Sequence, residues 1–256
     1  MKETFLCQVI ILFATPLIVM SNEYDKCGAV NKNDGHFAIS DIRTDDIYAP
    51  WLASVGRFDS VDKVDVYKVI CSGSVLTPRI LATAAHCFHL LSWQTKEDRP
   101  SHIRVGGNRR DNKYIETRKI QEFRRHPNFT FPEFYFDVAL IILDEELIFS
   151  QRISPICLPQ SVSSYAGENN NFLIAQGWGK DDEGETGQSA SEVSLGIKSI
   201  GECTYRFNNP GARYRDQVNA YMPELIKDNI LFCAESDLNS DLGTCHADSG
   251  GPAIQK

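Results

Sequence analysis

Short apolar runs rich in β-branched residues, separated by turn signals, make up most of the chain after residue 49. The clearest examples span 51–55, 64–70, 103–105, 114–120, 138–143, 172–175 and 230–233. Runs of this length at this spacing are typical of strands, so the sequence predicts an all-β fold, either a barrel or a sandwich. Residues 22–49 are polar and show no periodic apolar pattern, which indicates a leader and not part of a core.

The first residues of the chain predict the compartment of the protein. Lys2 precedes an apolar run over 5–20 that polar residues and a proline interrupt. Val19 and Ser21 are small enough for a signal-peptidase site, so we predict a signal peptide at 1–21 and a secreted, extracellular protein. An N-terminal membrane anchor is the alternative, although the run is short for a span of about 20 apolar residues. No other segment has the apolar composition of a membrane span, so we expect no membrane partner.

The acidic balance of the chain argues against one class of partner. The formal net charge is −8, and Lys2 and Glu3 cancel within the signal peptide, so the mature chain keeps this charge. A nucleic-acid-binding protein displaces counterions with an excess of basic side chains, which is missing here. We therefore expect no nucleic-acid partner.

The cysteines indicate a disulfide framework. Without Cys7 of the signal peptide, seven remain: Cys27, Cys71, Cys87, Cys157, Cys203, Cys233 and Cys245. In a secreted protein such cysteines form disulfides, and an odd number leaves one thiol without a partner in this chain. No Cys-x-x-Cys pair or His/Cys cluster has zinc spacing, so we expect no metal site and no cofactor.

A serine inside a glycine-rich turn, at 243–252, indicates nucleophilic catalysis. Gly250 and Gly251 let the backbone pass close to a substrate, because they carry no Cβ. The N–H groups of Ala247 and Ser249 could converge on one point and stabilise an oxyanion. A serine hydroxyl is a weak nucleophile, so the chain must supply a base and a group that orients the base.

His86 and Asp137 are the candidates for these two roles. His86 directly precedes Cys87, and Cys71 lies sixteen residues before Cys87, a spacing that suits a disulfide restraining the histidine. Asp137 stands at the head of a very apolar run. Such a residue can be an ordinary solvated aspartate at a strand end, or it can hold a neutral imidazole in the right tautomer.

The order of His86, Asp137 and Ser249, with their flanking residues, resembles the chymotrypsin/trypsin-like serine endopeptidase family. The resemblance runs from about residue 39 to the end of the chain. Its further motifs are Pro50-Trp51, Cys71 to Cys87, Pro155-Ile156-Cys157-Leu158-Pro159, Gly177-Trp178-Gly179 and Cys203 to Cys233.

The resemblance implies a protease domain at 39–256, built as two antiparallel six-stranded β-barrels with the active site between them. It implies that Ser249 attacks the carbonyl of a protein or peptide substrate, that His86 takes the serine proton, and that Asp137 orients His86. An activating protease and a serpin-type inhibitor are the partners implied. A catalytically silent homologue that acts as a binding or regulatory module is the alternative function.

The resemblance also implies the cysteine pairing. Cys71 would pair with Cys87, and Cys203 with Cys233. Cys27 would pair with Cys157 and tether the leader at 22–38 after activation. In the family, further strands and the partner of Cys245 follow the serine, whereas this chain ends at Lys256. The domain is therefore expected to lack its C-terminal part, with the second barrel truncated and Cys245 unpaired.

Three positions depart from the family pattern. Gly243, six residues before the serine, stands where trypsin-like members carry an aspartate at the pocket floor, which favours a small or apolar P1 residue. Ala247 replaces the usual glycine of the oxyanion turn, and its Cβ either disturbs that turn or is tolerated. Ile39 could become the new N-terminus and pair with Asp248, but Ala38 precedes it, so a trypsin-like activator would not cut there.

One modification site is predicted outside the catalytic motifs. Asn128-Phe129-Thr130 is an N-glycosylation sequon on a polar stretch, and in a secreted protein we expect Asn128 to be modified.

Overall fold

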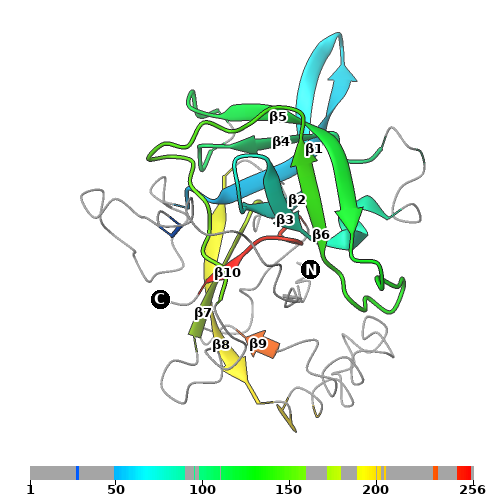
Figure 1. Ribbon diagram of the computed structural model, residues 1–256, viewed down its shortest axis with the longest axis vertical. Coiled ribbons are helices and arrows are strands. Elements are labelled where there is room, and N and C mark those ends of the chain that lie inside the picture. The colour runs from blue at the N-terminus through cyan, green and yellow to red at the C-terminus, as the bar shows by residue number, and fades with distance from the viewer. Residues whose placement is uncertain are drawn as a thin grey trace, which may run out of the picture.

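The computed structural model describes residues 27–28, 49–89, 95, 98–109, 111–159, 172–179, 189–199, 201–202, 205, 233–235 and 247–254. Six antiparallel strands of this part close a barrel in the order β1-β2-β3-β6-β5-β4 (Figure 1). The strands are β1 (Leu52–Val61), β2 (Val64–Val75), β3 (Ile80–Thr83), β4 (His102–Val105), β5 (Glu116–Arg125) and β6 (Ala139–Leu143).

The interior of this barrel is apolar because alternate residues of its strands point inward and are apolar. In β6, Ala139, Ile141 and Leu143 are buried, while the residues between them are less so. These residues join a core of aliphatic side chains from the other strands. Its fully buried members include Val55, Val75, Leu81 and Ile103.

Strand β5 differs from the run predicted at 114–120. It begins at Glu116 and continues to Arg125, and most of its residues are partly or fully exposed. Charged side chains fill its outward positions, and Arg124 pairs there with Glu122 at 2.8 Å. A strand with one face toward solvent needs apolar residues only on its other face, so the second half of β5 shows no continuous apolar run in the sequence.

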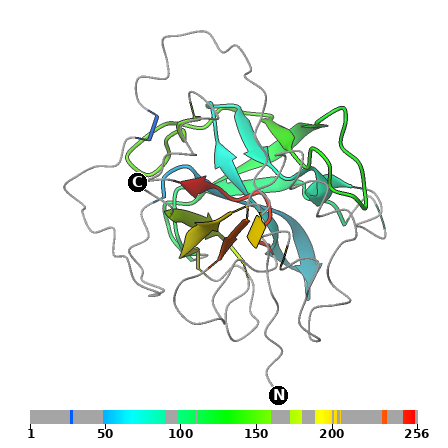
Figure 2. The same cartoon turned by 90° about the horizontal axis from the view of Figure 1, so that it is seen from below.

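A second, smaller sheet lies below the barrel in Figure 1 and in front of it in the view from below in Figure 2. It contains four strands in the order β10-β7-β8-β9. They are β7 (Phe172–Gly177), β8 (Ser191–Lys198), β9 (Cys233–Glu235) and β10 (Ala253–Ile254). The all-β fold and the first six-stranded barrel are confirmed, whereas a six-stranded and truncated second barrel stays a prediction.

A mixed apolar cluster joins the barrel to the second sheet. Trp51 and Tyr67 come from the barrel side, and Trp178 and Ala247 from the other side, and all four are buried. The indole N–H of Trp51 donates to Gln176 Oε1 at 2.9 Å across this contact. The two parts therefore share a packed interface that is dry enough to bury a polar bond.

The predicted leader contacts the segment that follows β6 at one described place. Cys27 forms a disulfide with Cys157, and the neighbouring Gly28 N–H donates to the Pro155 carbonyl at 2.9 Å. Residues 27–28 are thus attached through both a covalent bond and a backbone hydrogen bond.

Helical structure is sparse in the part of the chain that the structure describes. The 3-10 helix η3 (Ala85–Phe88) follows β3 directly. No helix there has the length and apolar character needed to cross a membrane.

Candidate active site

Strand pairing brings His86 and Asp137 together. Strands β3 and β6 are antiparallel neighbours, with Thr83 opposite Ala139. His86 comes three residues after Thr83 in η3, and Asp137 comes two residues before Ala139. Because the end of one strand lies beside the start of the other, two residues 51 positions apart become neighbours.

Asp137 binds His86 through both carboxylate oxygens. Its Oδ1 accepts the backbone N–H of His86 at 2.7 Å, and its Oδ2 lies 2.6 Å from His86 Nδ1. An ionised carboxylate only accepts, so this contact assigns the proton to Nδ1 and leaves Nε2 as the acceptor of the ring. The Asp137 side chain is 1% exposed, which is inconsistent with the alternative of a solvated strand-end aspartate.

The disulfide Cys71–Cys87 anchors the helix that carries the histidine. Both sulfur atoms lie within 4.8 Å of a His86 ring nitrogen, a grouping that resembles metal ligands. Both sulfurs are already bonded to each other, so neither is available as the thiolate that binds zinc.

Ser72, at the barrel end next to the disulfide, holds the turn that carries Ser249. The Ser72 N–H donates to the Ser249 carbonyl at 2.9 Å, and the Ser72 hydroxyl donates to the Ala247 carbonyl at 2.9 Å. The same hydroxyl accepts the Trp178 N–H at 2.9 Å. Thr83 completes the arrangement by donating its hydroxyl to the Ser72 carbonyl at 2.7 Å. No motif in the sequence predicted a role for Ser72, although it directly follows Cys71.

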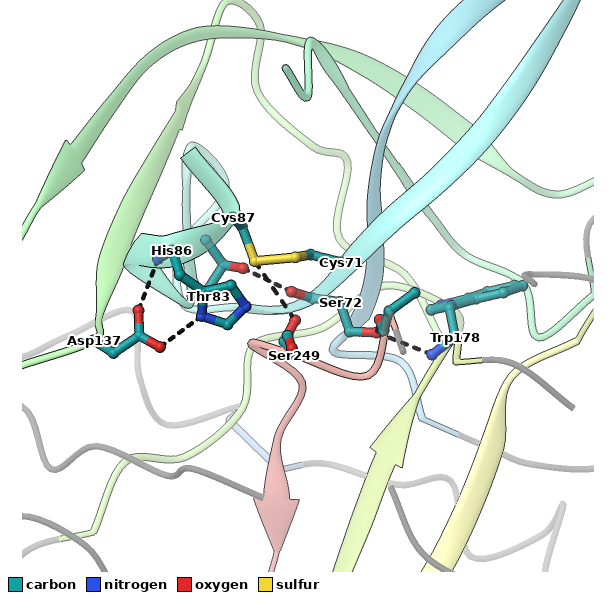
Figure 3. The surroundings of a disulfide bond; sticks show 9 residues. Cys71, Ser72, Thr83, His86, Cys87, Asp137, Trp178 and Ser249 are labelled. Atoms are coloured by element: carbon teal, nitrogen blue, oxygen red, sulfur yellow. Dashed lines mark hydrogen bonds and ion pairs between the residues drawn. A yellow bond between two sulfur atoms is a disulfide. The ribbon is translucent and has the colours of Figure 1, made fainter. Parts of the chain in front are cut away.

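Figure 3 shows the His86 ring between Asp137 and the Ser249 turn. The Ser249 carbonyl oxygen lies 3.9 Å from Cys87 Sγ. That sulfur also lies within 4.8 Å of a His86 ring nitrogen, so the serine turn and the histidine flank the same disulfide. The three residues that the sequence predicted as a set therefore lie in one place.

The serine turn contains two left-handed residues. Gly250 has φ 82°, and a Cβ on it would lie 2.3 Å from the Thr83 hydroxyl oxygen and 2.6 Å from the Ala84 nitrogen. Only glycine fits this position. Ala247 has φ 77°, a conformation that costs an L-residue about 1–2 kcal/mol. Packing of its buried methyl group in the mixed cluster offsets part of this cost.

Asp248 lies in a recess formed by two glycines. Its Oδ1 accepts the Gly179 N–H at 2.6 Å. A Cβ on Gly177 would lie 2.1 Å from Oδ1, and one on Gly179 would lie 2.3 Å from Oδ2. The motif Gly177-Trp178-Gly179 thus provides the space for this carboxylate. Its predicted partner, the amine of Ile39, lies outside the described residues.

Several other predicted site residues also fall outside that description. They are Gly243 of the pocket floor, the unpaired Cys245, and the pair Cys203–Cys233, of which only the Cys233 backbone is placed, in β9. These assignments stay predictions. Asn128 is described and its side chain is exposed.

The structure places an aromatic cluster beside His86 that was not predicted from the sequence. The Phe134 ring lies 5.7 Å from the His86 ring, edge to face, and contacts Phe131 at 5.3 Å. Phe131 stacks on His89 at 4.6 Å, and Phe129 lies 5.8 Å from the same ring. Burial, together with Arg125 and Arg99, lowers the pKa of His89. The high proportion of phenylalanine over 129–136 is the sequence feature that could have predicted this cluster.

Comparison with known proteins identifies relatives among the serine proteases, in agreement with the geometry of the site. Residues 39–256 match the family model Trypsin. The chain is 31% identical to "Serine proteinase stubble" of Drosophila melanogaster, over 81% of this chain and 24% of that protein. It is 24% identical to "Clotting factor C" of Tachypleus tridentatus, over 80% of this chain and 19% of that protein. For "Phenoloxidase-activating factor 1" of Holotrichia diomphalia, the identity is 27%, over 80% of this chain and 54% of that protein.

The chain thus spans about a fifth to a half of the length of these relatives. The match across 39–256 covers most of the chain and includes the barrel, the second sheet and the three clustered residues. This chain belongs to the trypsin family of serine proteases, peptidase S1.

Proposed function

We propose that the protein is a secreted serine endopeptidase that hydrolyses peptide bonds through an acyl-enzyme. The observation that supports this most is the two-point contact between Asp137 and His86, with the Ser249 turn held next to it. A buried carboxylate that fixes the tautomer of an imidazole is the arrangement that activates a serine hydroxyl.

The proposed reaction assigns one role to each group. Ser249 Oγ attacks the substrate carbonyl carbon, and its proton passes to His86 Nε2. Asp137 stabilises the imidazolium that results. The N–H groups of Ala247 and Ser249 stabilise the oxyanion, and His86 then returns the proton to the leaving amine. Water attacks the acyl-enzyme by the same path and regenerates Ser249.

The proposed specificity differs from that of trypsin. Gly243 offers no carboxylate to bind a lysine or arginine side chain. A substrate with a small or apolar P1 residue avoids burying an unpaired charge, which is costly. A panel of peptide substrates that differ only at P1 tests this proposal, and faster cleavage after arginine than after alanine or leucine would contradict it.

We further infer that the protein is made as a zymogen and works in a proteolytic cascade. The relatives "Clotting factor C" and "Phenoloxidase-activating factor 1" are named as a clotting factor and an activating factor, and the leader bound through Cys157 suits a cleaved but attached segment. An activating protease and a serpin-type inhibitor are the partners that such a position requires.

One observation favours a second candidate, a silent homologue that binds and does not cleave. Ala247 has a left-handed conformation, which the glycine usual at this position in the family adopts without cost. The oxyanion turn is therefore under strain in this chain. If that strain redirects the Ala247 N–H, the enzyme loses a donor worth about 10²–10³ in kcat.

A fluorophosphonate probe distinguishes the two candidates, because it reacts only with an activated serine. The full-length protein is secreted from insect cells with an enteropeptidase site placed directly before Ile39, and is then cut. We expect labelling of the cut wild type and none of Ser249→Ala. If a folded, cut wild type labels no better than Ser249→Ala, the protein is the silent homologue.

A further inference from the structure

The loop between β5 and β6 combines a modification sequon with a position beside the histidine. The loop follows Arg125 and ends at Ala139, so Asp137 is part of it. The sequon Asn128-Phe129-Thr130 lies in its first half.

Backbone hydrogen bonds close the base of this loop and cross its interior. The His126 N–H donates to the Val138 carbonyl at 2.8 Å and closes the base of the loop. Within it, the Thr130 N–H donates to the Tyr135 carbonyl at 3.2 Å, and the Phe134 N–H to the Thr130 carbonyl at 3.0 Å. The Asn128 and Thr130 side chains remain exposed, as a sequon must be to accept a glycan.

The middle residue of the sequon links it to the catalytic helix. Phe129 points toward the aromatic cluster and lies 5.8 Å from the His89 ring. The His89 N–H donates to the His86 carbonyl at 3.1 Å, so His89 caps the helix η3 that carries the histidine. On the other side of the loop, Phe134 contacts the His86 ring itself. Asn128 is therefore an exposed position of a loop whose neighbouring residue, Phe129, lies against the cap of η3.

We propose that Asn128 carries an N-linked glycan that restricts access to the His86 side of the active site according to size. The inference rests on the proposed protease function. A glycan is bulky and hydrated, and here its attachment site lies in a loop that contacts the cap of η3 through Phe129. A short peptide can pass beneath it, whereas a folded protein that approaches over the loop meets it.

The test compares one reactive group on two carriers. Biotinylated fluorophosphonate is used alone and after loading onto streptavidin, so only the size of the carrier changes. Asn128→Gln and Thr130→Val remove the sequon, and Thr130→Ser keeps it as the matched control. Glycan occupancy is measured separately, as the mass change of the Asn128 peptide after enzymatic deglycosylation.

We expect equal labelling rates for the free probe in all four proteins. For the streptavidin-loaded probe, we expect faster labelling of Asn128→Gln and Thr130→Val, by severalfold, than of wild type and Thr130→Ser. An unmodified Asn128, or the same ratio of the two probe rates in all four proteins, would contradict the proposal that a glycan restricts access by size. Neither result would contradict the protease function. If neither the free nor the streptavidin-loaded probe labels any of the four proteins, the protease function is contradicted, and the proposed effect of the glycan with it.

Discussion

Asp137 accepts two hydrogen bonds from His86, at 2.7 Å from the backbone N–H and 2.6 Å from ring Nδ1. The first bond fixes where the histidine stands, and the second fixes which ring nitrogen carries the proton. Asp137→Asn is expected to keep the fold and to place an amide N–H opposite Nδ1, which favours the wrong tautomer. The labelling rate with fluorophosphonate should fall by about 10⁴-fold, the size of effect known for this loss in a Ser-His-Asp enzyme. A fall of less than tenfold, with an unchanged melting temperature, would mean that Asp137 does not orient a base.

Ser72→Ala tests the bond between the barrel and the serine turn. The substitution leaves the buried Trp178 N–H and the Ala247 carbonyl without their shared partner, so the free energy of unfolding should drop by about 1–3 kcal/mol. Ser154→Ala is the matched control, because the Ser154 hydroxyl is buried and has no hydrogen-bond partner in the described part of the chain. Urea unfolding measures both. Equal losses for the two variants would contradict a special role for Ser72.

Gly179→Ala tests the recess that holds Asp248. The new Cβ would lie within 2.5 Å of three carboxylate atoms of Asp248, so the side chain or the β7 end must move. Overpacking of this kind costs about 1–3 kcal/mol, and here it also displaces the residue next to Ser249. We expect a lower melting temperature together with the loss of labelling. Gly201→Ala provides the comparison, since a Cβ there meets no atom within 4 Å, and it should change neither quantity.

His102 makes the stability of the barrel sensitive to acid. Burial, then the cross-strand Lys119, lowers the pKa of His102 below its usual value. The unfolded chain therefore binds a proton more readily than the folded protein does, and stability is lost as the pH falls below about 6.5. The loss is complete below the folded-state pKa.

Between pH 7.5 and 5.5, the wild type should accordingly lose more unfolding free energy than His102→Gln. Lys119→Gln should lose an intermediate amount, because it removes one of the causes of the lowered pKa. Parallel losses in the wild type and His102→Gln would show that His102 does not couple folding to pH.

The disulfide Cys27–Cys157 should keep the leader attached after activation. A cut before Ile39 separates the leader from the domain in sequence, but the disulfide joins positions 130 residues apart across that cut. On a denaturing gel, the cut protein should run as one band without reductant and as two bands with it. Cys157→Ser should release the leader in both lanes. Release from the wild type without reductant would contradict the tether.

The sequence predicted the strands of the first barrel where apolar residues alternate or cluster, as in β6. It did not predict the second half of β5, because that strand carries charged residues on its exposed positions. Nor could it show the closure of the barrel, since closure depends on pairing between β1 and β4, which are distant in sequence.

The residue types of the site, their order and the chemistry that they permit were determined by the sequence alone, because nucleophile, base and acid have few substitutes. The tertiary structure decided how these residues are held. Ser72 meets Ala247, 175 positions away, and Trp178, 106 positions away, through a hydroxyl that any exposed serine also carries. Its role follows from its burial between two parts of the fold. An unpaired backbone group is costly there, and the Ser72 hydroxyl pairs with two such groups, the Ala247 carbonyl and the Trp178 N–H.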